Sequence, residues 1–207
     1  MRLSILLLTK GISDTDMNKV LVLGCSGSGK STFAVKLHEK TNLPLYHLDN
    51  IWWKADRTHI TRDEFDSSLD ELIRHERWII DGDYNRTYEK RIAACDTIFF
   101  LDYGESVCME GIISRIGENR PDMPWTEDEL DPELVELIKN YEKANKPRLM
   151  ELFAKYPEKT VITFKSREEA ESWTSPNEPS MTVSIILTPM LIACCAATGR
   201  TIDRTFA

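Results

Sequence analysis

A glycine-rich octapeptide constrains the fold of this chain more than any other segment. Residues 24–31 read Gly-Cys-Ser-Gly-Ser-Gly-Lys-Ser, a full match to the phosphate-binding loop pattern G-x-x-x-x-G-K-[ST]. Such a loop must join a buried strand to a helix. Here the apolar run 20–23 precedes it, and Phe33, Ala34 and Leu37 follow on one helical face. The pattern predicts a nucleoside triphosphate site, the alternative being a glycine-serine turn that matches by chance.

Each residue type in this loop has a physical role toward a bound triphosphate. Glycines let the backbone turn its N–H groups inward, the Lys30 ammonium reaches the β and γ phosphates, and the Ser31 hydroxyl binds Mg²⁺. The positive N-terminus of the helix expected over 31–40 adds to this attraction. The residues expected to bind the nucleotide are Gly24, Cys25, Ser26, Gly27, Ser28, Gly29, Lys30, Ser31 and Thr32.

Length and charge limit the classes of partner. The chain has 207 residues, enough for one domain with a sizeable core and too few for two large ones. A formal net charge of −8 and a pI near 5.1 argue against a broad surface for nucleic acid or anionic membranes, which needs clustered lysine and arginine. We therefore expect a small-molecule partner and no direct contact with nucleic acid. The sequence does not indicate an oligomeric state.

Cysteine and histidine spacing argues against disulfide frameworks and zinc sites. The five cysteines have no C-x-x-C spacing and include one inside the loop, which favours a reducing compartment such as the cytoplasm. The histidines show no H-x-x-x-H spacing, so surface or boundary roles are expected for each. These residues are Cys25, Cys95, Cys108, Cys194 and Cys195, and His38, His47, His59 and His75.

The two ends of the chain differ from its middle. Residues 1–16 hold a short apolar run and a polar stretch, so we expect Met17 to be the functional start or this segment to be a dispensable extension. The tail over 174–207 begins with helix breakers and continues as an apolar run over 181–197, which is short for a membrane span and contains a proline. A loosely packed or poorly ordered tail is favoured over a membrane anchor, and 17–173 is expected to form one domain.

Between these ends, strand-like and helix-like segments alternate, a pattern typical of a parallel sheet covered by helices on both faces. Strands are expected at Lys19–Leu23, Leu45–Leu48, Trp78–Asp81, Thr97–Leu101 and Thr160–Phe164. The pattern predicts an α/β fold with three layers, of the P-loop NTPase type, around a five-stranded parallel sheet.

Capping boxes and apolar stripes mark the helices. Boxes with glutamate three residues later predict helix starts at Thr61, Thr126 and Ser166. Apolar residues at helical offsets predict the buried faces of two further stretches, and both stripes are expected in the core. The stripes are Phe65, Leu69, Leu72 and Ile73, and Leu149, Leu152, Phe153 and Tyr156.

Acidic residues at strand ends are candidates for binding the metal and the acceptor. In an open parallel sheet, ligands bind outside the carboxyl ends of the strands, where Asp81, Asp102 and Asp49 are all expected. Asp81 is the favoured Mg²⁺ ligand because Gly82 after it allows close backbone approach, whereas a capping or turn role fits Asp102. Asp49 is placed to orient or deprotonate an acceptor hydroxyl, or to cap a turn.

Aromatic residues and arginines complete the candidate site. Trp52 and Trp53 follow Asp49 and are candidates for the wall of an acceptor pocket, the alternative for each being packing under the next helix. Arg115 and Arg120 flank a glycine-containing segment between helices and predict a closing lid that supplies charge to the transferring phosphate. Arg86 and Arg91 are candidates for an anionic group of the acceptor, with surface salt bridges as the alternative.

These motifs, in this order, resemble those of the small adenylate kinase-related P-loop kinases, in particular the branch labelled DNA topology modulation proteins. The resemblance covers 17–173. It rests on 24–32, 47–53, 78–84, 91–96 and 115–125. It implies a nucleotide-kinase fold with a short helical lid. Adenylate kinases carry an aromatic residue, a proline and an arginine after the third-strand Asp-Gly, whereas this chain has Asp-Tyr-Asn-Arg there, so the resemblance does not extend to AMP as acceptor.

The function predicted by these observations is transfer of the γ phosphate of ATP, with Mg²⁺, to a small acceptor such as a nucleotide or nucleoside. Lys30, Arg115, Arg120 and Asp49 are the expected catalytic residues, Ser31 and Asp81 the metal ligands, and Asp49, Trp52, Tyr84, Arg86 and Arg91 the acceptor-binding residues. Two alternatives are a nucleotide-binding regulatory protein linked to DNA topology and an NTPase that needs no acceptor.

Overall fold

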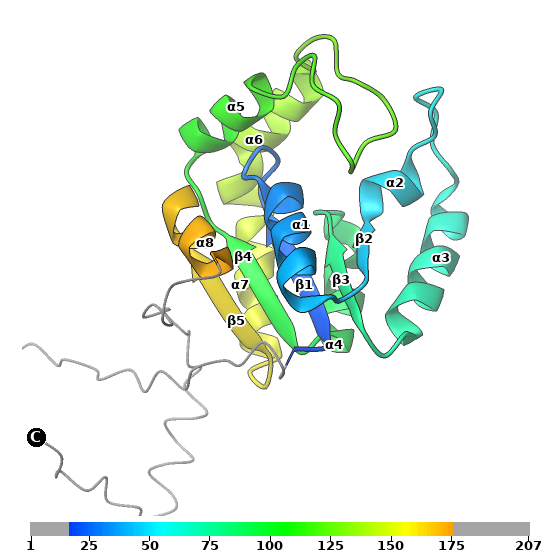
Figure 1. Ribbon diagram of the computed structural model, residues 1–207, viewed down its shortest axis with the longest axis vertical. Coiled ribbons are helices and arrows are strands. Elements are labelled where there is room, and N and C mark those ends of the chain that lie inside the picture. Colours follow the sequence, from blue (N-terminus) through cyan, green and yellow to red (C-terminus); the bar gives the residue numbers. More distant parts are fainter. Residues whose placement is uncertain (1–16, 176–207) are drawn as a thin grey trace, which may run out of the picture.

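Five parallel strands in the order β2-β3-β1-β4-β5 form the centre of the computed structural model, which describes residues 17–175 (Figure 1). The strands are β1 (Lys19–Gly24), β2 (Leu45–His47), β3 (Trp78–Asp81), β4 (Thr97–Leu101) and β5 (Thr160–Phe164). They confirm the predicted α/β fold with its five-stranded parallel sheet. The predictions for 1–16 and for the tail, including the apolar run 181–197, concern residues outside this range.

The strands form where the sequence has short apolar runs, because a parallel sheet is buried on both faces. Residues Val20 to Leu23 of β1 have no exposed surface, and every residue of β3 and β4 is buried. The register pairs Val22 with Asp81 and Gly24 with Leu101. The carboxyl ends of β1, β3 and β4 therefore lie at one edge of the sheet.

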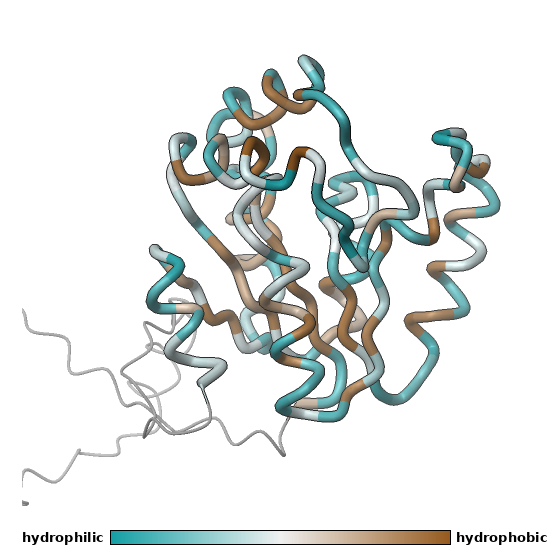
Figure 2. Tube along the Cα trace, turned by 45° about the horizontal axis from the view of Figure 1, so that its top comes forward, coloured by the Kyte–Doolittle hydropathy of each residue, from teal (hydrophilic) through white to brown (hydrophobic). Residues whose placement is uncertain are grey.

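Helices cover both faces of this sheet. They are α1 (Lys30–Thr41), α2 (Leu48–Trp52), α3 (Arg62–Arg74), α4 (Tyr88–Ala94), α5 (Glu105–Ile113), α6 (Pro132–Ala144), α7 (Lys146–Lys155) and α8 (Arg167–Thr174), with a single 3-10 turn η2 (Asn85–Thr87) before α4. Figure 2 shows the central strands as largely hydrophobic and the outer helices and loops as the more hydrophilic part.

Two neighbouring residues of β4 show how the layers are built. Successive side chains of a strand point to opposite faces of the sheet. The Phe99 ring lies 5.0 Å from Phe33 of α1 and 4.6 Å from Trp173 of α8. The Phe100 ring lies 5.6 Å from Phe153 of α7 on the other face. Helices α1 and α8 therefore cover one face, and α7, with α4 packed beside it, covers the other (Figure 1).

Two of the three predicted capping boxes begin helices. Thr61 and Glu64 exchange hydrogen bonds at the start of α3, and the Ser166 hydroxyl accepts from the Glu169 N–H at the start of α8. The prediction of a helix starting at Thr126 is wrong: α6 begins only at Pro132. Asp131 caps that helix, and a proline in the first turn costs no hydrogen bond there, so this start is the stronger one.

Candidate active site

The glycine-rich loop lies between β1 and α1, as predicted. It leaves the sheet at Gly24 and ends at Gly29, which is the N-cap of α1 with φ 90°, a left-handed conformation that glycine adopts without strain. The helix N-terminus and its free N–H groups are thereby turned toward the edge of the sheet where the strands end. The Lys30 ammonium folds back over the loop and donates to the Cys25 carbonyl oxygen at 2.9 Å.

The loop packs against α5 through two glycines. A Cβ atom on Gly27 would lie 2.0 Å from the Cys108 carbonyl oxygen, and one on Gly111 would lie 1.9 Å from the Gly27 carbonyl oxygen. Both distances are far below van der Waals contact. The phosphate-binding loop and α5 therefore touch through their main chains, and this contact requires glycine at both positions.

The Gly111→Ala variant tests this contact. Alanine favours a helix over glycine by about 1 kcal/mol, so the helix alone would gain stability. We expect the opposite, because the methyl group pushes α5 from the loop and overpacking costs about 1–3 kcal/mol. Thermal unfolding should therefore shift to lower temperature and the Kd for ATP should rise. Gly104→Ala at the start of the same helix is the matched control, since its Cβ would meet no atom within 4 Å; equal effects of both variants would contradict the argument.

A cleft of about 1250 Å³ opens at this edge of the sheet. The segment between α5 and α6, residues 114–131, passes over the strand ends toward α2 and is called the lid segment below (Figure 1). It is held there by Asn50, whose side-chain amide donates to the Pro121 carbonyl oxygen at 2.7 Å. The cleft thus lies between the loop on one side and the lid segment on the other.

The cleft brings together most of the residues that the sequence singled out. Those lining it are Ser26, Gly27, Gly29, Lys30, Ser31 and Thr32 of the loop, together with Asp49, Asp81, Tyr84, Arg115 and Arg120. Three further loop residues, Gly24, Cys25 and Ser28, are not part of its lining. The Ser28 side chain is buried and, with Gly29, borders a smaller pocket instead.

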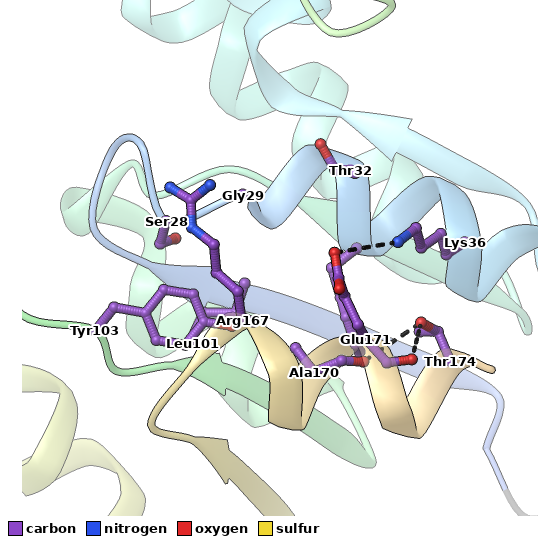
Figure 3. Close-up of a pocket in the computed structure, with 11 residues that line it drawn as sticks. Ser28, Gly29, Thr32, Lys36, Leu101, Tyr103, Arg167, Ala170, Glu171 and Thr174 are labelled. Carbon is purple, nitrogen blue, oxygen red and sulfur yellow. Dashed lines mark hydrogen bonds and ion pairs between the residues drawn. The ribbon is translucent and has the colours of Figure 1, made fainter. Parts of the chain in front are cut away.

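This smaller pocket of about 100 Å³ lies between the loop, α1 and α8 (Figure 3). The Arg167 side chain stands at one end beside Ser28 and Tyr103, and the Lys36 ammonium lies 3.7 Å from the Glu171 carboxylate at the other. Arg167 and Lys36 also line the larger cleft, so the two spaces adjoin.

Asp81 has the chemistry expected of a metal-ordering carboxylate. It is 3% exposed, its Oδ2 lies 2.9 Å from His47 Nδ1, and its other oxygen has no hydrogen-bond partner. A buried carboxylate oxygen without a partner is costly unless a cation or water binds it. Mg²⁺ is typically held by one or two carboxylates plus waters and phosphate oxygens, so Asp81 and Ser31 fit the ion with its nucleotide.

The alternative carboxylate, Asp102, is engaged elsewhere. Its two oxygens pair with the ammonium groups of Lys146 and Lys165, and it does not line the cleft. The structure instead places Asp122 of the lid segment beside the loop. The Ser31 hydroxyl donates to its Oδ2 at 2.9 Å, and Asp122 is only 5% exposed.

His47 forms the second half of the Asp81 pair. Burial lowers the pKa of His47, but the hydrogen bond to Asp81 and the surrounding carboxylates outweigh it and raise the pKa above 6.5. The folded state therefore holds this proton to higher pH than the unfolded chain. Stability from the pair is fully present below about pH 6.5 and is lost as the pH rises through the higher folded pKa.

The His47→Gln variant is expected to remove this slope of stability with pH. Urea unfolding of the wild type and of His47→Gln is measured at pH values from 5.5 to 9. The difference in unfolding free energy between the two proteins should shrink as the pH rises. The exposed His75→Gln variant is the control and should keep the wild-type slope. A wild-type slope in His47→Gln would show that the pair does not titrate in this range.

Asp49 and Tyr84 face each other in the lining of the cleft. The Tyr84 hydroxyl donates to Asp49 Oδ1 at 2.7 Å. Burial raises the pKa of Asp49 above its usual range, although the tyrosine bond opposes this. Burial, with the nearby Asp49 charge, also raises the pKa of Tyr84. A carboxylate with raised proton affinity beside a phosphate site is suited to accept a hydroxyl proton.

Three residues proposed for the acceptor do not line the cleft, and these assignments are corrected. Trp52 packs under α3 and lies 5.5 Å from the Phe65 ring, so the packing alternative holds. The exposed Arg86 forms a bidentate pair with Asp66. Arg91 is fully buried, and its guanidinium donates to the carbonyl oxygens of residues 82–84 and to a threonine hydroxyl. It braces the turn after β3 rather than contacting a ligand.

The lid arginines reach the cleft, already paired with carboxylates. Arg120 donates to both oxygens of Asp122, at 3.1 and 2.8 Å, and to Glu127 at 3.1 Å. Arg115 donates to Glu127 at 3.0 Å. Since Asp122 also accepts from Ser31, a chain of contacts connects Arg120 to the loop. The lid segment thus holds two guanidinium groups near the loop, each paired with carboxylates of the same segment.

Several residues of the site were missed from the sequence. His47 was expected at the surface or boundary, yet it contacts Asp81 across neighbouring strands. Trp53 was a candidate for the pocket wall together with Trp52, and it does line the cleft, 5.2 Å from the Trp125 ring of the lid segment. Asp83 and Asp122 lay inside segments already singled out, and only the acidic character of these segments could have indicated them.

Within residues 17–175, no helix is both long and apolar enough to cross a membrane. The described cysteines Cys25, Cys95 and Cys108 are buried free thiols.

Comparison with known proteins bears on the fold. No protein-family model and no curated protein sequence matches the chain. Among solved structures, it is similar to the shikimate kinase from Acinetobacter baumannii in complex with shikimate, with a TM-score of 0.51 and 14% identity over 77% of this chain and 93% of that one. It is also similar to the shikimate kinase from Bacteroides thetaiotaomicron, with a TM-score of 0.50 and 17% identity over 76% and 94%. The chain therefore shares the fold of these two shikimate kinases.

Proposed function

We propose that this protein transfers the γ phosphate of ATP to the hydroxyl group of a small molecule. The observation that carries the proposal is the composition of one cleft. This cleft is lined by the phosphate-binding loop with Lys30, by the Asp49–Tyr84 pair and by the arginines of the lid segment. A nucleotide-binding switch needs only the loop, whereas phosphoryl transfer also needs an acceptor group and positive charge near the phosphate.

The residues divide into a donor side and an acceptor side. The loop N–H groups and Lys30 would bind the triphosphate, and the pocket by Arg167 and Tyr103 would take the base. Mg²⁺, held by Ser31 and Asp81, would supply charge neutralisation between the phosphates. Asp49 would accept the proton of the attacking hydroxyl, with Tyr84 fixing its orientation, and Arg115 and Arg120 would stabilise charge on the transferring group.

The kinase fold of the similar structures supports this proposal. The acidic chain without a readable DNA-binding motif makes a regulatory protein linked to DNA topology the weaker alternative, and we keep the DNA topology modulation branch as a prediction. We also propose that 17–173 is the catalytic unit. An NTPase without acceptor is the third alternative, which the Asp49–Tyr84 pair disfavours.

Labelled ATP tests the proposal directly. The full chain is incubated with Mg²⁺ and [γ-³²P]ATP, alone and with a panel of small hydroxyl compounds, and labelled products are separated from inorganic phosphate. A kinase gives acceptor-dependent labelled product. Phosphate release at full rate without acceptor would support the NTPase, and tight, salt-sensitive DNA binding without transfer would support the regulatory alternative.

A further inference from the structure

Part of the cleft lining is rich in carboxylates and aromatic groups, and we call this part the acceptor half. Its members are Asp49, Trp53, Asp83, Tyr84, Asn85 and Asn145, all of which line the cleft. The unpartnered oxygen of Asp81 lies at the adjoining strand end. Two of these members, Asp49 and Asp83, carry a carboxyl group, Asp81 adds a third beside them, and none of the acceptor half carries a cationic group.

The carboxylate of Asp83 is held in the lining of the cleft by hydrogen bonds. Hydroxyl and amide groups bond both of its oxygens: the Tyr88 hydroxyl donates to one and the Asn145 side-chain amide donates to the other at 3.2 Å. Burial raises the pKa of Asp83, and Lys30 and Arg91 oppose this. The acceptor half therefore holds two carboxyl groups, Asp49 and Asp83, that hydrogen bonds keep in place.

The cations of the cleft are all committed elsewhere. Lys30, Lys36 and Arg167 stand at the loop, on the side of the triphosphate. The remaining cationic residues that line the described cleft each pair with carboxylates: Arg57 with Asp128, Arg115 with Glu127, and Arg120 with Asp122 and Glu127. Arg91, which lies close by, directs its guanidinium to backbone carbonyl groups. Among the described residues, the one cation that also acts on Asp49 and Asp83 from the loop is Lys30, which the triphosphate would bind. An acceptor carrying a phosphate or carboxylate would then meet like charge in the acceptor half.

We propose that the acceptor is a hydroxyl compound without an anionic group, such as a neutral polyol, a nucleoside or an amino alcohol, and that the carboxylates of the acceptor half exclude anionic analogues. The inference rests on the proposed kinase function. Like charges held a few ångströms apart in a partly buried site repel strongly, and such built-in repulsion is a common source of specificity.

Phosphoryl transfer to such an acceptor needs only ATP, the acceptor hydroxyl and a group that takes the proton. The bond from the γ phosphorus to the β–γ bridging oxygen breaks, and its electron pair leaves with ADP. A new bond forms between the γ phosphorus and the acceptor oxygen, and the hydroxyl proton passes to Asp49. No additional co-reactant is needed. A cationic amine elsewhere on the acceptor would be stabilised by Asp83 and by the faces of Trp53 and Tyr84.

Matched acceptor pairs that differ by one anionic group provide the test. We would compare adenosine with AMP, glucose with glucuronate, and ethanolamine with serine, with shikimate as a further anionic compound. Transfer from [γ-³²P]ATP gives kcat/KM for each. In every pair of which at least one member is phosphorylated, we expect the kcat/KM of the member without the anionic group to be higher, on the order of tenfold or more. Preference for the anionic members would overturn the inference while leaving the kinase function intact.

The Asp83→Asn variant tests the origin of this preference. Asparagine keeps the size of the side chain and one hydrogen-bond acceptor, but it removes the negative charge. We expect the kcat/KM ratio between paired acceptors to shift toward the anionic member on the order of tenfold. General damage would lower both values and leave the ratio unchanged. Asp70→Asn, on an exposed residue paired with Lys90, is the control and should leave the ratio unchanged.

An unshifted ratio in Asp83→Asn would overturn the role of this carboxylate. Absence of transfer to every compound, with ATP still bound in a calorimetric titration, would refute the proposed function and the inference together. Transfer to anionic acceptors alone would refute the inference only, so the two failures are distinguishable.

Discussion

Replacement of Arg120 by alanine is expected to lower turnover about a thousandfold or more, because a positioned arginine contributes this much to phosphoryl transfer. Arg120 is the better placed of the two lid arginines. Its guanidinium donates to both oxygens of Asp122, which in turn accepts from Ser31 of the loop. A γ phosphate bound beside Ser31 would offer oxygens that replace those of Asp122. The loss should appear in kcat measured with the best acceptor, while the Kd for ATP changes much less.

Two further variants separate charge, geometry and stability. Arg120→Lys keeps the charge but loses the planar fork, so an intermediate rate is expected. Arg86→Ala removes an arginine whose bidentate partner, Asp66, lies outside the cleft, and its turnover should match the wild type. An unchanged rate in Arg120→Ala, with the fold intact by circular dichroism, would remove this residue from the mechanism.

The second large effect is expected for Lys30→Met. Methionine retains much of the length of lysine but has no charge, so it cannot bind the β and γ phosphates. Losing one preorganised cationic donor at a reacting group lowers turnover by at least about a hundredfold. ATP binding should weaken as well, because the interaction exists before transfer begins. Isothermal titration with ATP and Mg²⁺ measures the first effect, and labelled transfer measures the second.

The control for Lys30→Met is Lys139→Met. Lys139 is exposed on α6, where its ammonium pairs with Glu136 one turn away, and it is not part of the cleft lining. Surface pairs of this kind contribute little to stability, so both ATP binding and turnover should remain unchanged. Equal ATP affinity in Lys30→Met and wild type would contradict the assignment of the loop as the phosphate site.

The sheet could be predicted closely from the sequence because its strands are short apolar runs bounded by turns. Strands β3, β4 and β5 have the predicted bounds, whereas β1 extends one residue further and β2 stops one residue earlier. A strand buried on both faces leaves little choice of residue type. The start of α6 was misplaced because a capping-box pattern at Thr126 competes with an Asp-Pro start at 131–132, and only the packed fold decides between them.

The candidate site was less accessible to prediction, because its contacts join distant parts of the chain. The sequence marked the loop, Asp81 and the lid arginines through local patterns. It did not reveal the Ser31–Asp122 bond, which spans 91 positions, or the His47–Asp81 bond, which spans 34. Arg91 was misassigned for the same reason: whether a guanidinium faces solvent, ligand or backbone depends on the turn beside it.

The contact between Gly27 and Gly111 leaves no side chain between the glycine-rich loop and α5 at this point. Side chains between packed elements can change rotamer and absorb a small displacement, but here two main chains meet directly. A phosphate that draws the loop inward by a fraction of an ångström would therefore push or pull α5 along with it. Because α5 ends at Ile113, two residues before Arg115, that motion arrives at the root of the lid segment. Helix α5 would then couple the binding of a nucleotide at the loop to the position of the arginines in the lid segment.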